Sequence, residues 1–252
     1  MTISRIYLPQ KMEAGDRCEL TGENRQYVVS VLRMKRGNKL LLFDGTGCEY
    51  EASILGHDRE RVSLEVIRKE VIHQGTINIT LSQSLPKAKK MDFIIEKSCE
   101  LGVNRIVPFV SVRSIPRLPP EKASLKQARW QKIAIEAARK CHSNGIPEIG
   151  EIIAFEKMLR KAGKEALKII FWEEEMGRTL KHVLQAEESD ASRDFFLVVG
   201  PEGGFAREEV ELAESMGFTP VSLGRQILKV ETAVLAILSI IQYERGAFGV
   251  TK

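Results

Sequence analysis

The stretch FFLVVGPEGGFAREEVELAESMGFTPVSLGRQILKVETA, residues 195–233, decides the fold of this chain. It begins with a short apolar run, Phe195–Val199, that stops at a glycine, as a buried parallel strand does. A Gly-Pro-Glu-Gly-Gly loop, an acidic helix, a second strand and a second glycine-bearing loop, residues 223–233, follow and lead into an apolar helix. Two such loops at the carboxyl ends of successive strands mark the usual ligand site of an open α/β sheet.

The first loop carries a carboxylate, which bears on the ligand it takes. Its three glycines let the backbone turn sharply and approach a ligand closely, Pro201 stiffens the turn, and Glu202 lies inside it. Phosphate-binding loops use bare amides, often with a lysine, and this loop fits neither GxxxxGKS/T nor GxGxxG. A neutral or cationic small molecule suits it better. Alone, the loop is more typical of a structural turn; the second loop favours a ligand site.

The composition is that of a globular protein of one large or two ordinary domains. The chain has 252 residues, 43% of them hydrophobic and 29% charged. It contains neither a run of about 20 apolar residues nor a signal-peptide pattern at its start, so we expect a cytoplasmic protein without a membrane partner. The four cysteines and four histidines lack metal-ligand spacing, which predicts reduced thiols and no metal site.

Basic residues gather in one part of the chain. Between Arg105 and Lys140 there are nine basic residues against Glu121 and Glu136, a local charge of +7, although the whole chain carries only +4. Such a segment is typical of nucleic-acid contact. A solvated helix face accounts for the same composition equally well.

The chain changes character near residue 73. Residues 1–72 contain several short strands with turn signals and predict a small barrel, whereas residues 73–252 alternate strands and helices. We expect a small helix over Tyr27–Arg33 and a strand over Arg105–Val110 that is broken at Pro108. The final helix, Thr232–Tyr243, is apolar almost all round, which indicates burial inside the monomer or at a subunit interface.

Taken together, the sequence resembles the RsmE family, the 16S ribosomal RNA (uracil-N3)-methyltransferases of the SPOUT superfamily. The resemblance runs over nearly the whole chain and rests on the order and spacing of short motifs. These motifs are Arg5-Ile6-Tyr7, Val31-Leu32-Arg33, Leu85-Pro86-Lys87, Lys90-Met91-Asp92, Glu100-Leu101-Gly102-Val103, Arg113-Ser114, Arg129-Trp130, Ile146-Pro147-Glu148-Ile149, Gly200-Pro201-Glu202-Gly203-Gly204-Phe205, Leu223-Gly224, Ile227-Leu228 and Glu231-Thr232-Ala233.

The resemblance implies an α/β fold: a PUA-like β-barrel that binds RNA over residues 1–72, then a SPOUT-type methyltransferase domain with a trefoil knot over residues 73–252. It implies S-adenosylmethionine as the cofactor, 16S ribosomal RNA of the small subunit as the partner, and a homodimer formed through the C-terminal domain. The cofactor agrees with the loop chemistry, since its sulfonium is cationic and it carries no phosphate.

Three departures from the family pattern stand out. Arg139-Lys140-Cys141-His142-Ser143 replaces the usual Glu-Gln-Ser-x-Arg, and Lys229-Val230 replaces Arg-Ala before the Glu-Thr-Ala motif. Ala206 stands where Ser or Thr commonly caps the helix after the glycine loop, at an expected cost of about 1 kcal/mol.

The two loops and the basic residues supply the candidate site. For the cofactor we expect contacts from the loops and from the tryptophan after an earlier strand: Gly200, Pro201, Glu202, Gly203, Gly204, Leu223, Gly224, Ile227, Leu228, Thr232, Ala233 and Trp172. For RNA we expect contacts from Arg5, Arg33, Lys35, Arg36, Arg113, Arg117 and Arg139.

Methylation of uracil N3 requires loss of an imide proton and stabilisation of the resulting anion. Lys229 and Arg225 are the candidate cations, and Glu202 or Glu231 the candidate base, unless solvent or a phosphate takes the proton. Two alternatives remain open: a SPOUT enzyme that methylates another RNA base, and an RNA-binding assembly factor without activity.

Overall fold

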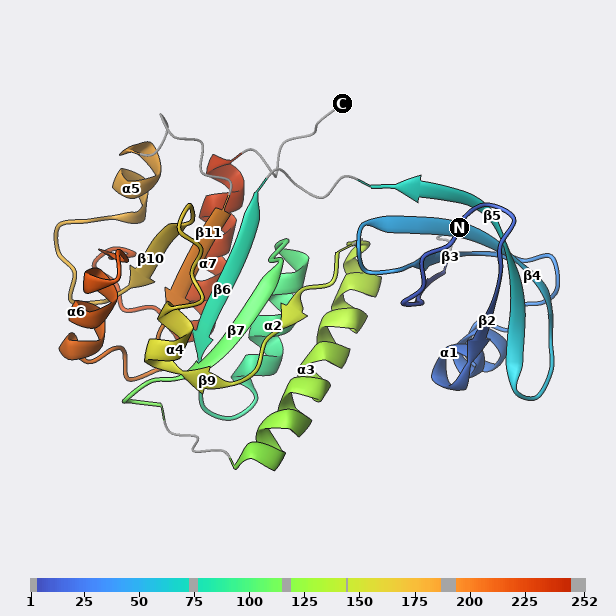
Figure 1. Ribbon diagram of the computed structural model, residues 1–252, viewed down its shortest axis with the longest axis horizontal. Helices are drawn as coiled ribbons and strands as arrows, with labels where there is room; N and C mark the ends of the chain where they lie inside the picture. The colour runs from blue at the N-terminus through green and yellow to red at the C-terminus, as the bar shows by residue number, and fades with distance from the viewer. Residues whose placement is uncertain (1–3, 73–76, 115–118, 144, 187–193, 246–252) are drawn as a thin grey trace. The chain divides into compact units, whose positions relative to one another are not determined.

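The computed structural model describes residues 4–72, 77–114, 119–143, 145–186 and 194–245 (Figure 1). The chain forms two compact units, each made of two segments. They are Met1–Gln74 with Ala138–Ile146, and Gly75–Ala137 with Pro147–Lys252. The first unit therefore includes a segment that lies far beyond residue 72 in the sequence.

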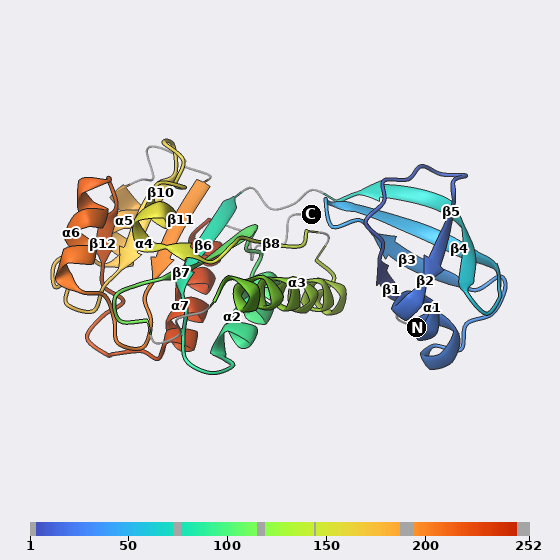
Figure 2. The same cartoon turned by 60° about the horizontal axis from the view of Figure 1, so that its bottom comes forward.

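The first unit is a five-stranded sheet that curls around its own core (Figures 1 and 2). Its strands are β1 (Arg5–Tyr7), β2 (Arg17–Thr21), β3 (Lys39–Phe43), β4 (Cys48–His57) and β5 (Arg61–Val71), in the order β1-β3-β4-β5-β2. The pair β1–β3 is parallel and the other pairs are antiparallel. Alternate residues of β4 and β5 are buried, as a sheet with one solvated face requires.

The predicted helix over Tyr27–Arg33 begins earlier than expected. Helix α1 (Gly22–Gln26) is followed directly by a single π-helical turn, Tyr27–Val31, in which only Val28 is fully buried. The chain leaves this turn through Arg33, whose φ of 52° lies in the left-handed region.

Arg5 is an internal anchor of the first unit. The residue is only 3% exposed, and its Nε donates to Oε2 of Glu49 at 2.8 Å. One of its terminal nitrogens donates to the carbonyl oxygens of Ala138 at 2.9 Å and Ser143 at 2.7 Å, and the guanidinium stacks on Phe43. The predicted RNA contact of Arg5 is therefore wrong, because these partners occupy the guanidinium in the interior.

The second unit contains a seven-stranded sheet in which every pair is parallel. Its strands are β6 (Asn78–Ser84), β7 (Arg105–Val110), β8 (Glu148–Ile149), β9 (Ile153–Ala154), β10 (Leu167–Phe171), β11 (Asp194–Val199) and β12 (Thr219–Val221). The order is β12-β10-β11-β6-β7-β8, and β9 also pairs with β7. All of β11 after Asp194 is buried, as expected for a strand covered on both faces.

Pro108 does not break its strand. β7 continues through it, with Pro108 paired in register with Gln83 of β6. The predicted interruption is wrong because the residues on both sides of the proline keep their places in the parallel ladder.

Six helices of the described chain accompany the sheet. They are α2 (Lys90–Glu100), α3 (Pro120–Cys141), α4 (Phe155–Leu159), α5 (Leu180–Ala186), α6 (Arg207–Ser215) and α7 (Val230–Glu244). Helix α7 packs against α2 and buries one face, while Ile240 and Tyr243 remain 39% and 74% exposed. Within the described ranges, no helix has the length and apolarity needed to cross a membrane.

Candidate functional site

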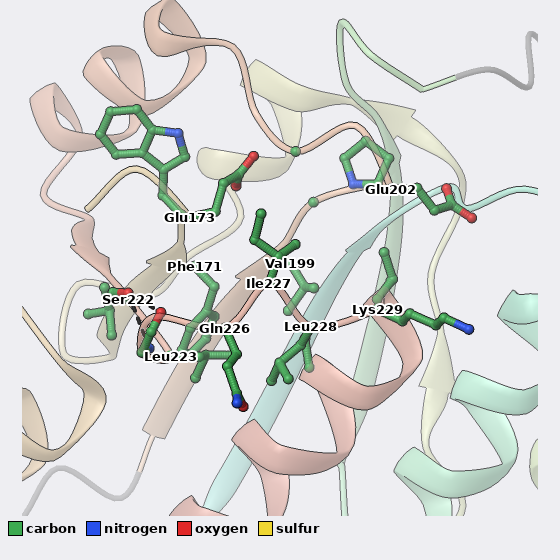
Figure 3. Close-up of a pocket in the computed structure, with 18 of the residues that line it drawn as sticks. Phe171, Glu173, Val199, Glu202, Ser222, Leu223, Gln226, Ile227, Leu228 and Lys229 are labelled. Atoms are coloured by element: carbon green, nitrogen blue, oxygen red, sulfur yellow. Dashed lines mark hydrogen bonds between the residues drawn. The ribbon is translucent and has the colours of Figure 1, made fainter. Parts of the chain in front are cut away.

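A cavity of about 310 Å³ opens at the carboxyl edge of β10, β11 and β12, between the two glycine-bearing loops (Figure 3). Because the three strands are parallel, their last residues meet at the same edge, and buried Phe171, Val199 and Val221 form its floor. In Figure 3 Glu202 and Lys229 lie on one side of the cavity and Ser222 on the other. The volume is in the range of small-molecule sites.

Glu202 is held on the rim by several donors. The backbone N–H of Lys87 donates to its two carboxylate oxygens at 3.1 and 3.3 Å, and Nζ of Lys90 lies 3.0 Å from Oε1. Burial by itself raises the pKa of Glu202, but hydrogen bonds from its own backbone, Lys90 and Lys87 outweigh that effect and lower it. The carboxylate is therefore ionised and a weak proton acceptor.

Lys90 joins this loop to the start of α7. Its Nζ also lies 3.4 Å from Oε2 of Glu231, so one ammonium bridges Glu202 and Glu231. The hydrogen bond with Glu202 raises the pKa of Lys90 and keeps it charged. Both carboxylates predicted as candidate bases are thus engaged in holding the two loops together.

The first loop needs glycine at position 204. Gly204 has a φ of +66°, and a Cβ there would lie 1.8 Å from Oε1 of Glu173, which follows β10. At Gly200 a Cβ would lie 3.1 Å from the ring of Phe205. A side chain at position 204 therefore displaces the carboxylate of Glu173, whereas one at position 200 makes a tight contact with the ring of Phe205.

The second loop turns through Gly224, whose φ is +116°. The hydroxyl of Ser222 accepts the N–H of Gly224 at 3.2 Å, and the N–H of Ser222 donates to the carbonyl of Arg178 at 2.8 Å. Beyond this fixed start the loop presents an apolar side chain to the cavity, because Ile227 is 88% exposed. The loop ends at Lys229, the N-cap of α7.

Gln83, near the end of β6, holds the start of the first glycine loop through its side-chain amide. Its buried amide nitrogen donates to the carbonyls of Ser84 at 2.8 Å and of Gly200 at 3.2 Å. Sequence reasoning missed this residue, since a glutamine near the end of an apolar strand is not a recognisable signal by itself.

Most of the predicted cofactor residues come together. The cavity is lined by Gly200, Pro201, Glu202, Gly204, Leu223, Gly224, Ile227, Leu228, Ala233 and Trp172 from that prediction, and by the predicted cations Arg225 and Lys229. Gly203 and Thr232 are not among its lining residues. Sequence reasoning missed further lining residues, several of which directly follow or end a strand: Lys90, Phe171, Glu173, Val199, Val221, Ser222, Gln226 and Val230.

Trp172 lines the cavity and carries a buried indole nitrogen. Its indole Nε1 is buried and has no hydrogen-bond partner among the described residues, while the guanidinium of Arg207 lies 5.4 Å from the ring centre. The ring packs against the core cluster that contains Phe205 and Phe218, so this N–H is an unsatisfied buried donor.

The basic residues predicted for RNA divide by exposure. Arg33, Lys35 and Arg36 are exposed on the turn before β3. Arg113 is exposed after β7 and donates to the carbonyl of Gly203 at 2.9 Å. Arg139 is half-buried and donates to the hydroxyl of Tyr27 at 2.9 Å. Arg117 lies outside the described residues.

No group of three or more His, Cys, Asp or Glu side chains with metal-binding geometry occurs in the described part of the chain.

Comparison with known proteins identifies both units. Residues 20–67 match the model of an RNA methyltransferase PUA domain, and residues 73–242 match that of an RNA methyltransferase domain. These matches confirm the predicted α/β fold behind a PUA-like unit; the trefoil knot stays a prediction.

Relatives agree along almost the whole chain. The ribosomal RNA small subunit methyltransferase E of Bacillus subtilis is 32% identical over 239 residues, which cover 93% of each chain. The same enzyme of Neisseria gonorrhoeae, solved bound to S-adenosyl methionine, superposes with a TM-score of 0.86 at 32% identity, covering 96% of this chain and 98% of that one. A Legionella pneumophila methyltransferase structure with the bound cofactor SAM gives 0.86 at 34% identity, with the same coverage. This chain belongs to the ribosomal RNA small subunit methyltransferase E family.

Proposed function

We propose that this protein is an S-adenosylmethionine-dependent methyltransferase that methylates N3 of a uridine in 16S ribosomal RNA of the small subunit. The observation that carries the proposal is the cavity between the two glycine-bearing loops, in a chain of this family. We further propose that the protein works in the cytoplasm, where its substrate is assembled.

The cavity residues fit S-adenosylmethionine. The floor is apolar, the carboxylate of Glu173 stands on the wall, and that of Glu202 lies on the rim. Carboxylates favour a ligand with a sulfonium and an ammonium group, and an apolar floor accepts an adenine ring. When bound, the cofactor supplies an electrophilic methyl group on sulfur.

Lys229 and Arg225 are the cations that we assign to the reacting base. Both are exposed and line the cavity, so each can reach a uracil placed at its mouth. Loss of the N3 proton leaves negative charge on the ring, and a neighbouring cation stabilises it as it develops. Glu202 suits the role of base poorly because its pKa is lowered and Lys90 holds it. We therefore propose that solvent or a phosphate takes the proton and that Glu202 positions the loop.

For the RNA we propose phosphate contacts from the exposed residues Arg33, Lys35 and Arg36 of the first unit and, separately, from the exposed Arg113 of the second. Phosphate contacts of this kind supply affinity without sequence information. We also propose a homodimer that covers the outer face of α7, where Ile240 and Tyr243 are exposed; α2, which packs against α7, carries the exposed Phe93. Replacing Ile240 with Glu would then yield monomers in sedimentation.

Two measurements test the function. Calorimetry with S-adenosylmethionine checks the cofactor, and absence of binding would refute an enzyme. Mass mapping of ribosomal RNA from a strain lacking this gene, with and without the gene restored, identifies the methylated base. A restored methyl group on another base or RNA would support a different methyltransferase, and cofactor-independent rescue of subunit assembly would support a binding factor.

A further inference from the structure

Glu209, in the first turn of α6, connects two loops that are far apart in the sequence. It is 6% exposed, and its two carboxylate oxygens accept different backbone donors. Oε2 accepts the N–H of Ala206 at 3.0 Å, at the end of the first glycine loop. Oε1 accepts the N–H of Val112 at 2.9 Å, in the loop after β7.

The bond between Glu209 and the N–H of Ala206 partly compensates for the absence of a capping side chain at the N-terminus of α6. Ala206 is the N-cap of α6 and has no side-chain acceptor, so only the glutamate half of a capping box forms. The bond with Val112 does not cap the helix, since Val112 lies in the loop after β7 and Glu209 in α6; it links these two segments. A buried carboxylate that accepts two N–H groups fixes the distance between the two segments.

The loop that contains Val112 is also held by hydrogen bonds of Ser114, two residues further on. The hydroxyl of Ser114 accepts the N–H of Ser111 at 3.0 Å and lies 2.7 Å from the hydroxyl of Ser84, at the end of β6. Arg113 lies between Val112 and Ser114 in the sequence; it is exposed and donates to the carbonyl of Gly203. Arg113 is thus held over the first glycine loop by bonds on both sides of it in the sequence.

We propose that Glu209 is a positioning residue that holds the Arg113 loop against the cofactor loop, so that Arg113 presents its guanidinium to the RNA backbone beside the transfer site. This inference rests on the proposed function, since it takes RNA as the ligand of Arg113. Glu209 acts through Arg113 and does not touch either reactant. A guanidinium fixed in this way binds a phosphate without first being ordered, which increases affinity.

Glu209→Gln separates the two bonds. A carboxamide has one acceptor oxygen, so it keeps the Ala206 bond three residues away and turns its NH₂ toward the Val112 N–H. We expect affinity for a small-subunit ribosomal RNA transcript to fall about tenfold, as for one lost charge-assisted contact, with S-adenosylmethionine affinity within about twofold of wild type. Glu208→Gln, on the exposed side of the same turn, is the matched control and leaves both affinities unchanged.

A double-mutant cycle with Arg113→Ala identifies the route of the effect. If Glu209 acts through Arg113, Glu209→Gln adds little to the loss of RNA affinity caused by Arg113→Ala. Additive losses would overturn the inference, and so would an equal fall in cofactor affinity, because Glu209 would then serve only as a helix cap.

Ser114→Ala provides a second variant if Glu209→Gln fails to fold. It removes the hydroxyl that holds the same loop to Ser84, and we expect the same selective loss of RNA affinity. Unchanged RNA affinity would overturn the inference. Wild-type protein that binds RNA and transfers no methyl group would refute the proposed function, and the affinity measurements would still decide the role of Glu209.

Discussion

Gly204→Ala tests the contact between the first glycine loop and Glu173. The φ of +66° at this position carries a penalty of about 1–2 kcal/mol for a residue with a Cβ. The Cβ would also lie 1.8 Å from Oε1 of Glu173, so this carboxylate has to leave its place on the cavity wall. We therefore expect two effects, a fall in melting temperature by a few degrees and a weaker affinity for S-adenosylmethionine.

The two effects can be measured separately. Gly217→Ala is the matched control, because Gly217 has a φ of +82° and a Cβ there would meet nothing within 4 Å. Both variants lose similar thermal stability, but only Gly204→Ala loses cofactor affinity in calorimetry, by about tenfold for one displaced charged group. In a Glu173→Ala background Gly204→Ala has no further effect on affinity. Equal cofactor affinity of the two glycine variants and wild type would refute the reasoning.

Four further predictions follow from named contacts. Arg5→Lys keeps the charge, but a single ammonium cannot reach all three acceptors that the guanidinium reaches through Nε, to Glu49, and through a terminal nitrogen, to two carbonyls. The free energy of unfolding in denaturant therefore falls by about 3 kcal/mol, whereas exposed Arg33→Lys changes it little. The pKa of Glu202 is lowered on folding, so its contribution to stability is complete above the unfolded value of about 4.3 and is lost as the pH falls through the folded pKa. The difference in stability between wild type and Glu202→Gln, measured by thermal unfolding at a series of pH values, should accordingly shrink as the pH falls into the acid range. A difference that stays constant with pH contradicts this prediction. Lys229→Ala lowers single-turnover methylation by about a hundredfold at unchanged cofactor affinity, and normal turnover removes Lys229 from the mechanism. Arg36→Ala reduces the salt slope of RNA binding by about 0.8, and an unchanged slope excludes a phosphate contact there.

Patterns of local origin could be predicted from the sequence. The apolar run Phe195–Val199 and its glycine stop predicted a buried strand and a loop at its carboxyl end, and the structure has both. The parallel sheet then brings the second loop to the same edge. This part succeeded because a strand end and a following glycine are encoded by adjacent residues.

Contacts between distant residues could not be predicted in this way. Glu173 and Lys90 line the cavity from the loop after β10 and from α2, while Gln83 of β6 supports the first glycine loop, and no local pattern marks any of them. Arg5 looked like a basic residue available to RNA, and only its partners at positions 138 and 143 reveal an internal role. The predicted interruption of β7 at Pro108 came from the average preference against proline inside a strand. The parallel pairing of β7 with β6 overrides that preference.

The buried guanidinium of Arg5 also sets an order of events during synthesis. Its acceptors at Ala138 and Ser143 leave the ribosome only after the whole first stretch of the unit has been translated, a delay of several seconds at ordinary elongation rates. Of the hydrogen-bond acceptors described for Arg5, Glu49 is the one made before that point. The N-terminal sheet is therefore the first part of the protein to be made, yet it completes its interior only when translation is well into the catalytic unit.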